Sequence, residues 1–114
     1  MKTYTVKEWL KKTFINEGFF TRPSALCKDG FSISIQGGTP HHYCKPLKYG
    51  LLAEELELGY PTNAIPELKK YSENDDCQGI FAYVPIKEVE EIIKQHGGII
   101  GDEETGAWYF IFHK

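Results

Sequence analysis

A loop with two histidines and a cysteine is the part of this sequence whose residue types could do chemistry. His41, His42 and Cys44 lie within four positions of one another, between the Gly37–Gly38 pair and Pro46. Imidazole nitrogen and thiolate sulfur are both ligands of zinc. A thiolate beside an imidazole can also act as a nucleophile, with the imidazole as its base. The loop therefore raises two hypotheses, a zinc site and a thiol enzyme.

The spacing of these residues does not match a metal site. Structural zinc takes four ligands, usually in paired short spacings, and the sequence contains neither C-x-x-C nor H-x₃-H. Further ligands would have to come from Cys27, Cys77 or His113. For thiol catalysis, Cys44 would also need a third group to orient its base. We therefore expect no metal, no cofactor and no catalytic residue, and interpret the loop as part of a lid or of a contact surface. A small metal-binding or thiol enzyme that uses this loop stays open as an alternative.

Aromatic residues form a second group with binding chemistry. Phe81 and Tyr83 alternate along one apolar run and Tyr109 lies in another, so we expect all three on one face of a sheet. Aromatic sheet faces can stack on the bases of single-stranded RNA. Such a face needs basic surroundings, and the charge pattern does not supply them. RNA binding stays open as a further alternative.

The charge of the chain is unevenly divided. Residues 1–50 hold eight Lys/Arg against three Asp/Glu, a net charge of +5, whereas residues 51–114 hold five against thirteen, a net charge of −8. The basic residues are scattered, which argues against nucleic acid as the partner. The split fits either a macromolecular partner or two halves that attract each other in the fold.

The periodicity of apolar residues predicts an α+β fold for residues 1–114 as one domain. Thr5 and Glu8 form a capping box at the start of a helix over 6–17, and the Asp29-Gly30 turn precedes an alternating strand. We expect strands at 26–28, 31–36, 54–60 (Leu56, Leu58 and Tyr60 inward), 80–84 and 107–113, a short helix at 65–71, and a long helix from Pro85 to the Gly97-Gly98 stop. This order predicts a mostly antiparallel sheet of about four or five strands with two main helices packed on one face.

The last two expected strands are apolar on both sides, as is typical of strands covered on both faces. In strand 80–84, alternation places Phe81 and Tyr83 opposite Ile80, Ala82 and Val84. Two helices cover one face of a sheet only. The long loop over 37–53 is the expected cover of the other face, and a second copy of the chain or a ligand are the alternatives.

The bulk properties are those of a cytoplasmic protein. No apolar run approaches the roughly 20 residues that span a bilayer, and the N-terminus lacks the apolar block of a signal peptide. The three cysteines are an odd, widely spaced set, so we expect reduced thiols and no disulfide framework.

Three segments together resemble a known group of proteins. They are 32–36 running into 42–46, then 57–61, and then 83–85 leading to 95–99. The combination resembles small single-domain proteins of gut-type bacteria and of their phages or conjugative elements. The resemblance implies a cellular setting but no activity.

The sequence as a whole favours a non-enzymatic binding or interaction domain, of the kind that serves a mobile element as an accessory or inhibitory protein. The expected partner is another protein or a second copy of the chain, with no membrane. The candidate binding residues come from the loop and from the aromatic face: His41, His42, Tyr43, Cys44, Phe81, Tyr83 and Tyr109.

Overall fold

The computed structural model confirms the α+β class. It describes residues 3–13, 22, 24–37, 44, 54–73 and 77–100. The elements are α1 (Val6–Lys12), β1 (Ala25–Leu26), β2 (Ser32–Gln36), β3 (Glu55–Gly59), the 3₁₀ helix η1 (Pro66–Tyr71), β4 (Ile80–Pro85) and α2 (Ile86–Gln95). α1 ends at Lys12, with Thr13 as its C-cap. Three expected parts lie outside the described residues: the strand at 107–113, residues 14–17 of the expected first helix and, apart from Gly37 and Cys44, the loop over 37–53.

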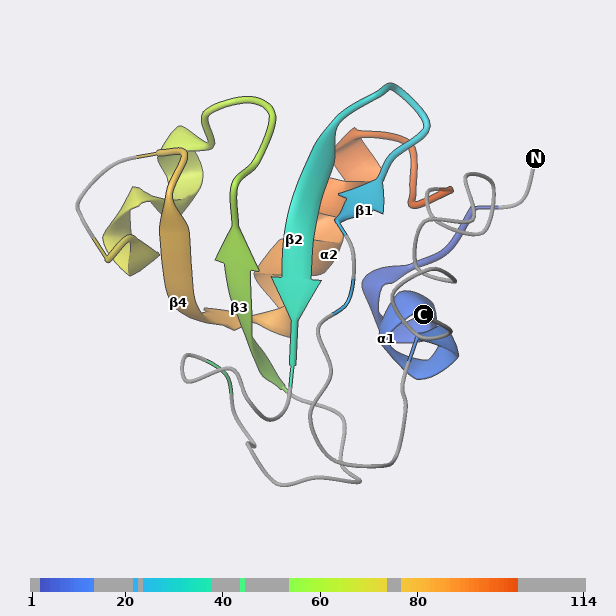
Figure 1. Ribbon diagram of the computed structural model, residues 1–114, viewed down its shortest axis with the longest axis horizontal. Helices are drawn as coiled ribbons and strands as arrows, with labels where there is room; N and C mark the ends of the chain where they lie inside the picture. The colour runs from blue at the N-terminus through green and yellow to red at the C-terminus, as the bar shows by residue number, and fades with distance from the viewer. Residues whose placement is uncertain are drawn as a thin grey trace.

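The sheet is an antiparallel meander in the order β1-β2-β3-β4. Its first hairpin confirms the Asp29-Gly30 turn: Ala25 pairs with Ile33 across it, and the Asp29 carboxylate accepts from the Phe31 amide at 3.0 Å. α2 lies across the back of the sheet, and α1 lies beside β1 and contacts α2 (Figure 1).

One face of the sheet faces the helices and forms the core. Alternation along β2 and β3 turns one set of side chains inward and leaves Ser32, Ser34, Glu55 and Glu57 half-buried on the other face. The helices contribute their apolar stripes to the same core. The central buried side chains are Val6, Trp9, Leu10, Ile33, Ile35, Leu56, Leu58, Phe81, Val84, Val89, Ile92 and Ile93.

A β-bulge changes the expected pattern of β4. Leu58 pairs with Phe81 and Leu56 pairs with Val84, so β4 has one more residue than β3 between these two pairs. Phe81 and Val84 are therefore both fully buried. The expectation from simple alternation, with Phe81 and Tyr83 together and Val84 opposite, was wrong because the bulge shifts the register.

Two tyrosines are exposed where the backbone has a positive φ. Tyr83, in the bulge, has φ 54° and Tyr60, just after β3, has φ 50°. This region is rare for a bulky residue. We expected Tyr60 to point inward, but its side chain is 72% exposed. The alternation of β3 stops at Gly59, because the chain leaves the extended conformation at Tyr60.

A short ladder beyond β1 brings the N-terminal segment to the end of α2. The Ile100 amide donates to the Leu26 carbonyl at 2.8 Å, and Tyr4 and Ile99 exchange two backbone hydrogen bonds of 2.8 and 3.0 Å. Residues 98–100 thus lie between β1 and Tyr4. This pairing places the start of α1 next to the last turn of α2.

Candidate functional site

The structure separates those residues of the predicted binding set that it describes. Phe81 is a core residue and Tyr83 is 38% exposed, so they share no binding face. Cys44 is fully buried. His41, His42, Tyr43 and Tyr109 lie outside the described residues.

Cys44 lies in the electrostatic field of a buried arginine. The Arg22 guanidinium donates to Thr13 Oγ1 at 2.6 Å, to the Gly37 carbonyl at 3.0 Å and to the Leu10 carbonyl at 3.1 Å. Burial lowers the pKa of Arg22 to about 10, while the Coulombic interaction with Cys44 acts in the opposite direction. The guanidinium is therefore still cationic at neutral pH. A neighbouring cation favours a thiolate, but a fully buried sulfur does not meet a substrate from solvent.

Cys27, Asp29 and His96 gather at the first hairpin in a combination typical of thiol enzymes. The Asp29 carboxylate lies 2.7 Å from His96 Nδ1, and the His96 ring stacks on Phe31 with 3.9 Å between ring centroids. Burial, with the Asp29 charge as a second cause, raises the pKa of Cys27 to about 12. Its thiol is thus protonated at neutral pH and only 1% exposed. The group fastens the end of α2 to the hairpin and does not form a nucleophilic site.

The Asp29 contact predicts a pH dependence of stability. Hydrogen bonds from the Phe31 amide and from His96 lower the pKa of Asp29 below 3.8. A lowered folded-state pKa gives stability that is complete above the unfolded pKa and is lost as the pH falls through the folded one. We expect Asp29→Asn to reduce the free energy of unfolding at pH 7 and the difference from wild type to shrink below about pH 4. Urea unfolding followed by circular dichroism between pH 2.5 and pH 7 measures this.

The control for this prediction is Glu67→Gln, which removes an exposed carboxylate of η1. Its effect should be small at every pH in the series. A gap between wild type and Asp29→Asn that stays constant down to pH 2.5 would contradict the proposed charge effect.

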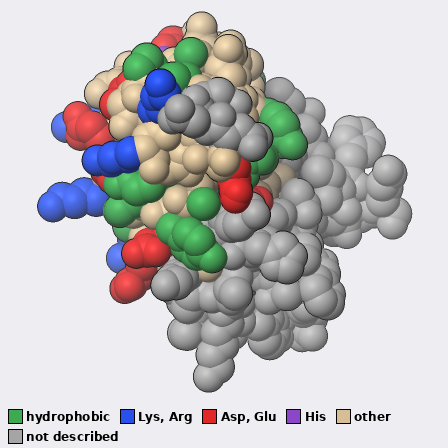
Figure 2. All heavy atoms as spheres, turned by 90° about the vertical axis from the view of Figure 1, so that its left-hand side faces the viewer, with side chains coloured by type: hydrophobic (Ala, Val, Ile, Leu, Met, Phe, Trp, Pro, Cys, Tyr) green, Lys and Arg blue, Asp and Glu red, His purple; other side chains and the backbone are tan. Residues whose placement is uncertain are grey.

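The described residues contain no cluster of three or more His, Cys, Asp or Glu side chains that could hold a metal ion. They also contain no helix that is long and apolar enough to cross a membrane. On the side of the molecule formed by η1 and β4, basic and acidic side chains are interspersed (Figure 2). In η1 itself, Glu67, Lys69 and Lys70 are exposed. This mixture does not resemble the basic stripe that nucleic acids require.

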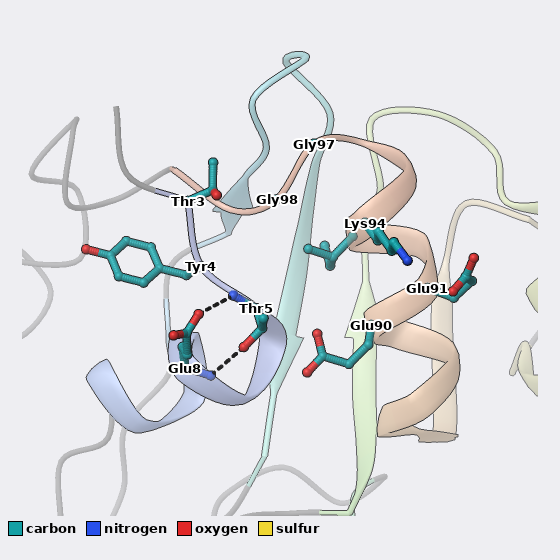
Figure 3. Close-up of a pocket in the computed structure, with 10 residues that line it drawn as sticks. Thr3, Tyr4, Thr5, Glu8, Glu90, Glu91, Lys94, Gly97 and Gly98 are labelled. Atoms are coloured by element: carbon teal, nitrogen blue, oxygen red, sulfur yellow. Dashed lines mark hydrogen bonds between the residues drawn. The ribbon is translucent and has the colours of Figure 1, made fainter.

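A pocket lies between the start of α1 and the last turns of α2, and we name it the α1–α2 pocket (Figure 3). Its volume is about 540 Å³, and apolar surface predominates in its lining. Pockets that bind small molecules are typically about 300–1,000 Å³. The lining residues are Thr3, Tyr4, Thr5, Glu8, Glu90, Glu91, Ile93, Lys94, Gly97 and Gly98.

Two glutamates of this pocket, one from each helix, cap the start of α1. The predicted capping box is present: the Glu8 amide donates to Thr5 Oγ1 at 3.1 Å, and the Thr5 amide donates to Glu8 Oε1 at 2.9 Å. Glu90 extends from α2 toward α1 (Figure 3) and accepts from the Val6 amide at 2.8 Å and the Lys7 amide at 3.1 Å. Two of the backbone amides at the start of α1 thus already donate to a carboxylate, that of Glu90. The same bonds hold α1 against α2.

The Gly97-Gly98 turn lines the α1–α2 pocket at the top of the view in Figure 3. Both residues have a positive φ, 89° and 91°, as expected for a helix stop. A Cβ on Gly98 would lie 2.8 Å from the Thr3 Cβ, closer than real contacts of this kind. Gly98 is therefore required both by its backbone conformation and by the close approach of Thr3.

This double requirement predicts different effects for two glycine variants. Gly30 has a φ of 96° with open space around it, so Gly30→Ala should lose about 1 kcal/mol from backbone strain alone. Gly98→Ala should lose about 1 kcal/mol more, since its Cβ meets Thr3. Urea unfolding of both variants measures the difference. Equal losses would show that the contact between Gly98 and Thr3 is not tight.

The α1–α2 pocket can bind but lacks a catalytic arrangement among its lining residues. Glu8 and Glu90 are engaged in helix capping, and the hydroxyl of Thr5 is an acceptor for the Glu8 amide. The pocket offers apolar walls, several carboxylate acceptors and the ammonium of Lys94. Such a lining favours a ligand with hydrogen-bond donors on an apolar frame.

Sequence reasoning recognised parts of this pocket but not its assembly. The capping box and the glycine pair were visible as a helix start and a helix stop. Nothing local indicates that they meet, because the meeting depends on the backbone pairing of Tyr4 with Ile99 and on the bond of Glu90 to Val6, 84 positions away.

Comparisons of the chain with models of protein families, with curated proteins and with solved structures find no match.

Proposed function

We propose that the protein is a non-enzymatic binding domain and that the α1–α2 pocket is its binding site. The observation that carries this proposal is the pocket itself: about 540 Å³ with a mostly apolar surface and several polar residues in its lining. Binding sites combine an apolar enclosure with a few convergent polar groups in this way. In the setting that the sequence resemblance implies, the domain would work in the cytoplasm as an accessory or inhibitory protein of a mobile element.

The thiols support binding over catalysis. Cys27 and Cys44, two of the three thiols, each neighbour a charged group and are 1% and 0% exposed. The third, Cys77, is partly buried. The Cys27 thiol, with its pKa near 12, is far from a reactive thiolate. Cys27 and Cys44 act as small apolar residues of the core.

Nuclear magnetic resonance with small apolar and amphipathic probes tests this proposal. We expect at least one uncharged apolar probe, such as norleucine blocked at both ends, to shift the backbone amides of Thr5, Glu8, Lys94 and Gly98. The amide of Leu68, which is buried under η1, is the internal control. Shifts confined to residues outside the α1–α2 pocket, or their complete absence, would overturn the proposal.

A further inference from the structure

We infer that the α1–α2 pocket takes a cationic group on an aliphatic stem, the chemistry of a lysine or arginine side chain on a partner protein. This inference rests on the proposed function and adds the chemical class of the ligand. It follows from the pocket's shape, its acceptors and its charge taken together.

The charge of the pocket is negative. Its lining residues include three glutamates, Glu8, Glu90 and Glu91, and one lysine, Lys94. Glu90 extends toward α1, whereas the Glu91 side chain lies on the side of α2 away from α1 (Figure 3). A pocket of this charge attracts cations and disfavours anions.

The acceptors of the pocket have capacity left. Each oxygen of the Glu90 carboxylate accepts one backbone amide of α1, and a carboxylate oxygen can accept about two hydrogen bonds. An ammonium group offers three donors and a guanidinium five, and neither has an acceptor. A pocket lined by several glutamates therefore complements these two cations better than it complements a neutral amide or an anion.

The walls of the pocket suit the rest of such a side chain. Ile93, Gly97 and Gly98 are among the lining residues, and the surface of the pocket as a whole is mostly apolar. Lysine and arginine bury their methylene stems along apolar surface and keep the charged end among polar groups. The aliphatic stem thus matches the apolar surface of the pocket, and the cation matches its glutamates.

Four probes test the inference by nuclear magnetic resonance titration: lysine, norleucine and glutamate, each blocked by acetylation and methylamidation, and pentylamine as a free amine. We expect blocked lysine to bind with a dissociation constant of about 1 mM or below and blocked norleucine to bind about 5-fold more weakly. Blocked glutamate should not shift the pocket amides. Pentylamine matching blocked lysine would point to a free amine as the ligand source, and weaker pentylamine binding to a peptide.

Charge variants complete the test. Glu91→Gln removes the charge of an exposed lining residue whose side chain extends from α2 away from α1 (Figure 3). It should weaken lysine binding about 3- to 10-fold and leave norleucine binding unchanged. Glu67→Gln makes the same chemical change outside the pocket and should alter neither.

The outcomes separate the two proposals. If norleucine binds in the pocket as tightly as lysine, or if Glu91→Gln does not distinguish them, the cationic ligand is refuted while the binding site survives. If no probe shifts the pocket amides, both the ligand class and the proposed function fail. Lysine binding that weakens with added salt, with norleucine binding unaffected, supports the cationic ligand.

Discussion

Phe81→Ala is expected to lower the free energy of unfolding by about 3–5 kcal/mol. Phe81, a residue of β4, is fully buried. Removal of its ring loses the free energy of burying that apolar surface and leaves a cavity in a close-packed core. This loss is a large share of the roughly 5–15 kcal/mol that stabilises a typical domain. Urea unfolding measured by circular dichroism tests the expectation. If the alanine variant is unfolded, Phe81→Leu keeps the experiment readable, because it retains much of the apolar volume.

Tyr83→Ala is the matched control. Tyr83 lies two positions further along β4, but the bulge leaves its side chain 38% exposed. We expect a clearly smaller loss than for Phe81→Ala, because truncation of a partly exposed side chain creates a smaller cavity. Equal losses at the two positions would contradict the bulged register and favour the simple alternation, in which the two side chains share a face.

Arg22→Met is expected to cost about 2–4 kcal/mol. The guanidinium is the donor to two backbone carbonyls, those of Leu10 and Gly37, and to Thr13 Oγ1. Arg22 is only 3% exposed, and each buried acceptor left without a donor costs about 1–3 kcal/mol. Methionine fills similar space and offers no donor. The change should appear as a lower urea midpoint.

One further variant separates geometry from charge at position 22, and a second serves as a surface control. Arg22→Lys keeps the charge but loses the planar fork that reaches three acceptors at once, so it should also destabilise the protein. Lys11→Met removes an exposed charge of α1 and should stay within about 0.5 kcal/mol of wild type. A neutral effect of Arg22→Met would show that the three bonds do not hold α1 to β2.

Arg22 also illustrates what a sequence pattern does not predict. It is the single arginine of the chain, and by its type it belongs on the surface. Its own backbone is held by Gln36, whose side chain accepts from the Arg22 amide at 2.9 Å and donates to the Arg22 carbonyl at 2.7 Å. These partners come from a strand 14 positions away, and no local rule identifies them.

The sequence by itself determined the local elements: the capping box of Thr5 and Glu8, the Asp29-Gly30 turn, the alternation of β2 and the Gly97-Gly98 stop. Each depends on interactions between residues a few positions apart, so its signal is contained in a short window. The antiparallel α+β class follows from the order of these elements.

Only the tertiary structure decided where the candidate site lies. The bulge in β4 is a property of pairing with β3, so Phe81 and Tyr83 could not be assigned to core and surface from β4 alone. The α1–α2 pocket depends on contacts between the two ends of the described chain, with Glu90 capping α1 and Ile99 pairing with Tyr4. The loop with His41, His42 and Cys44 was recognised in the sequence because its reactive residue types are close together along the chain. A pocket made by two distant segments has no local signature, because its walls exist only once the core has brought them together.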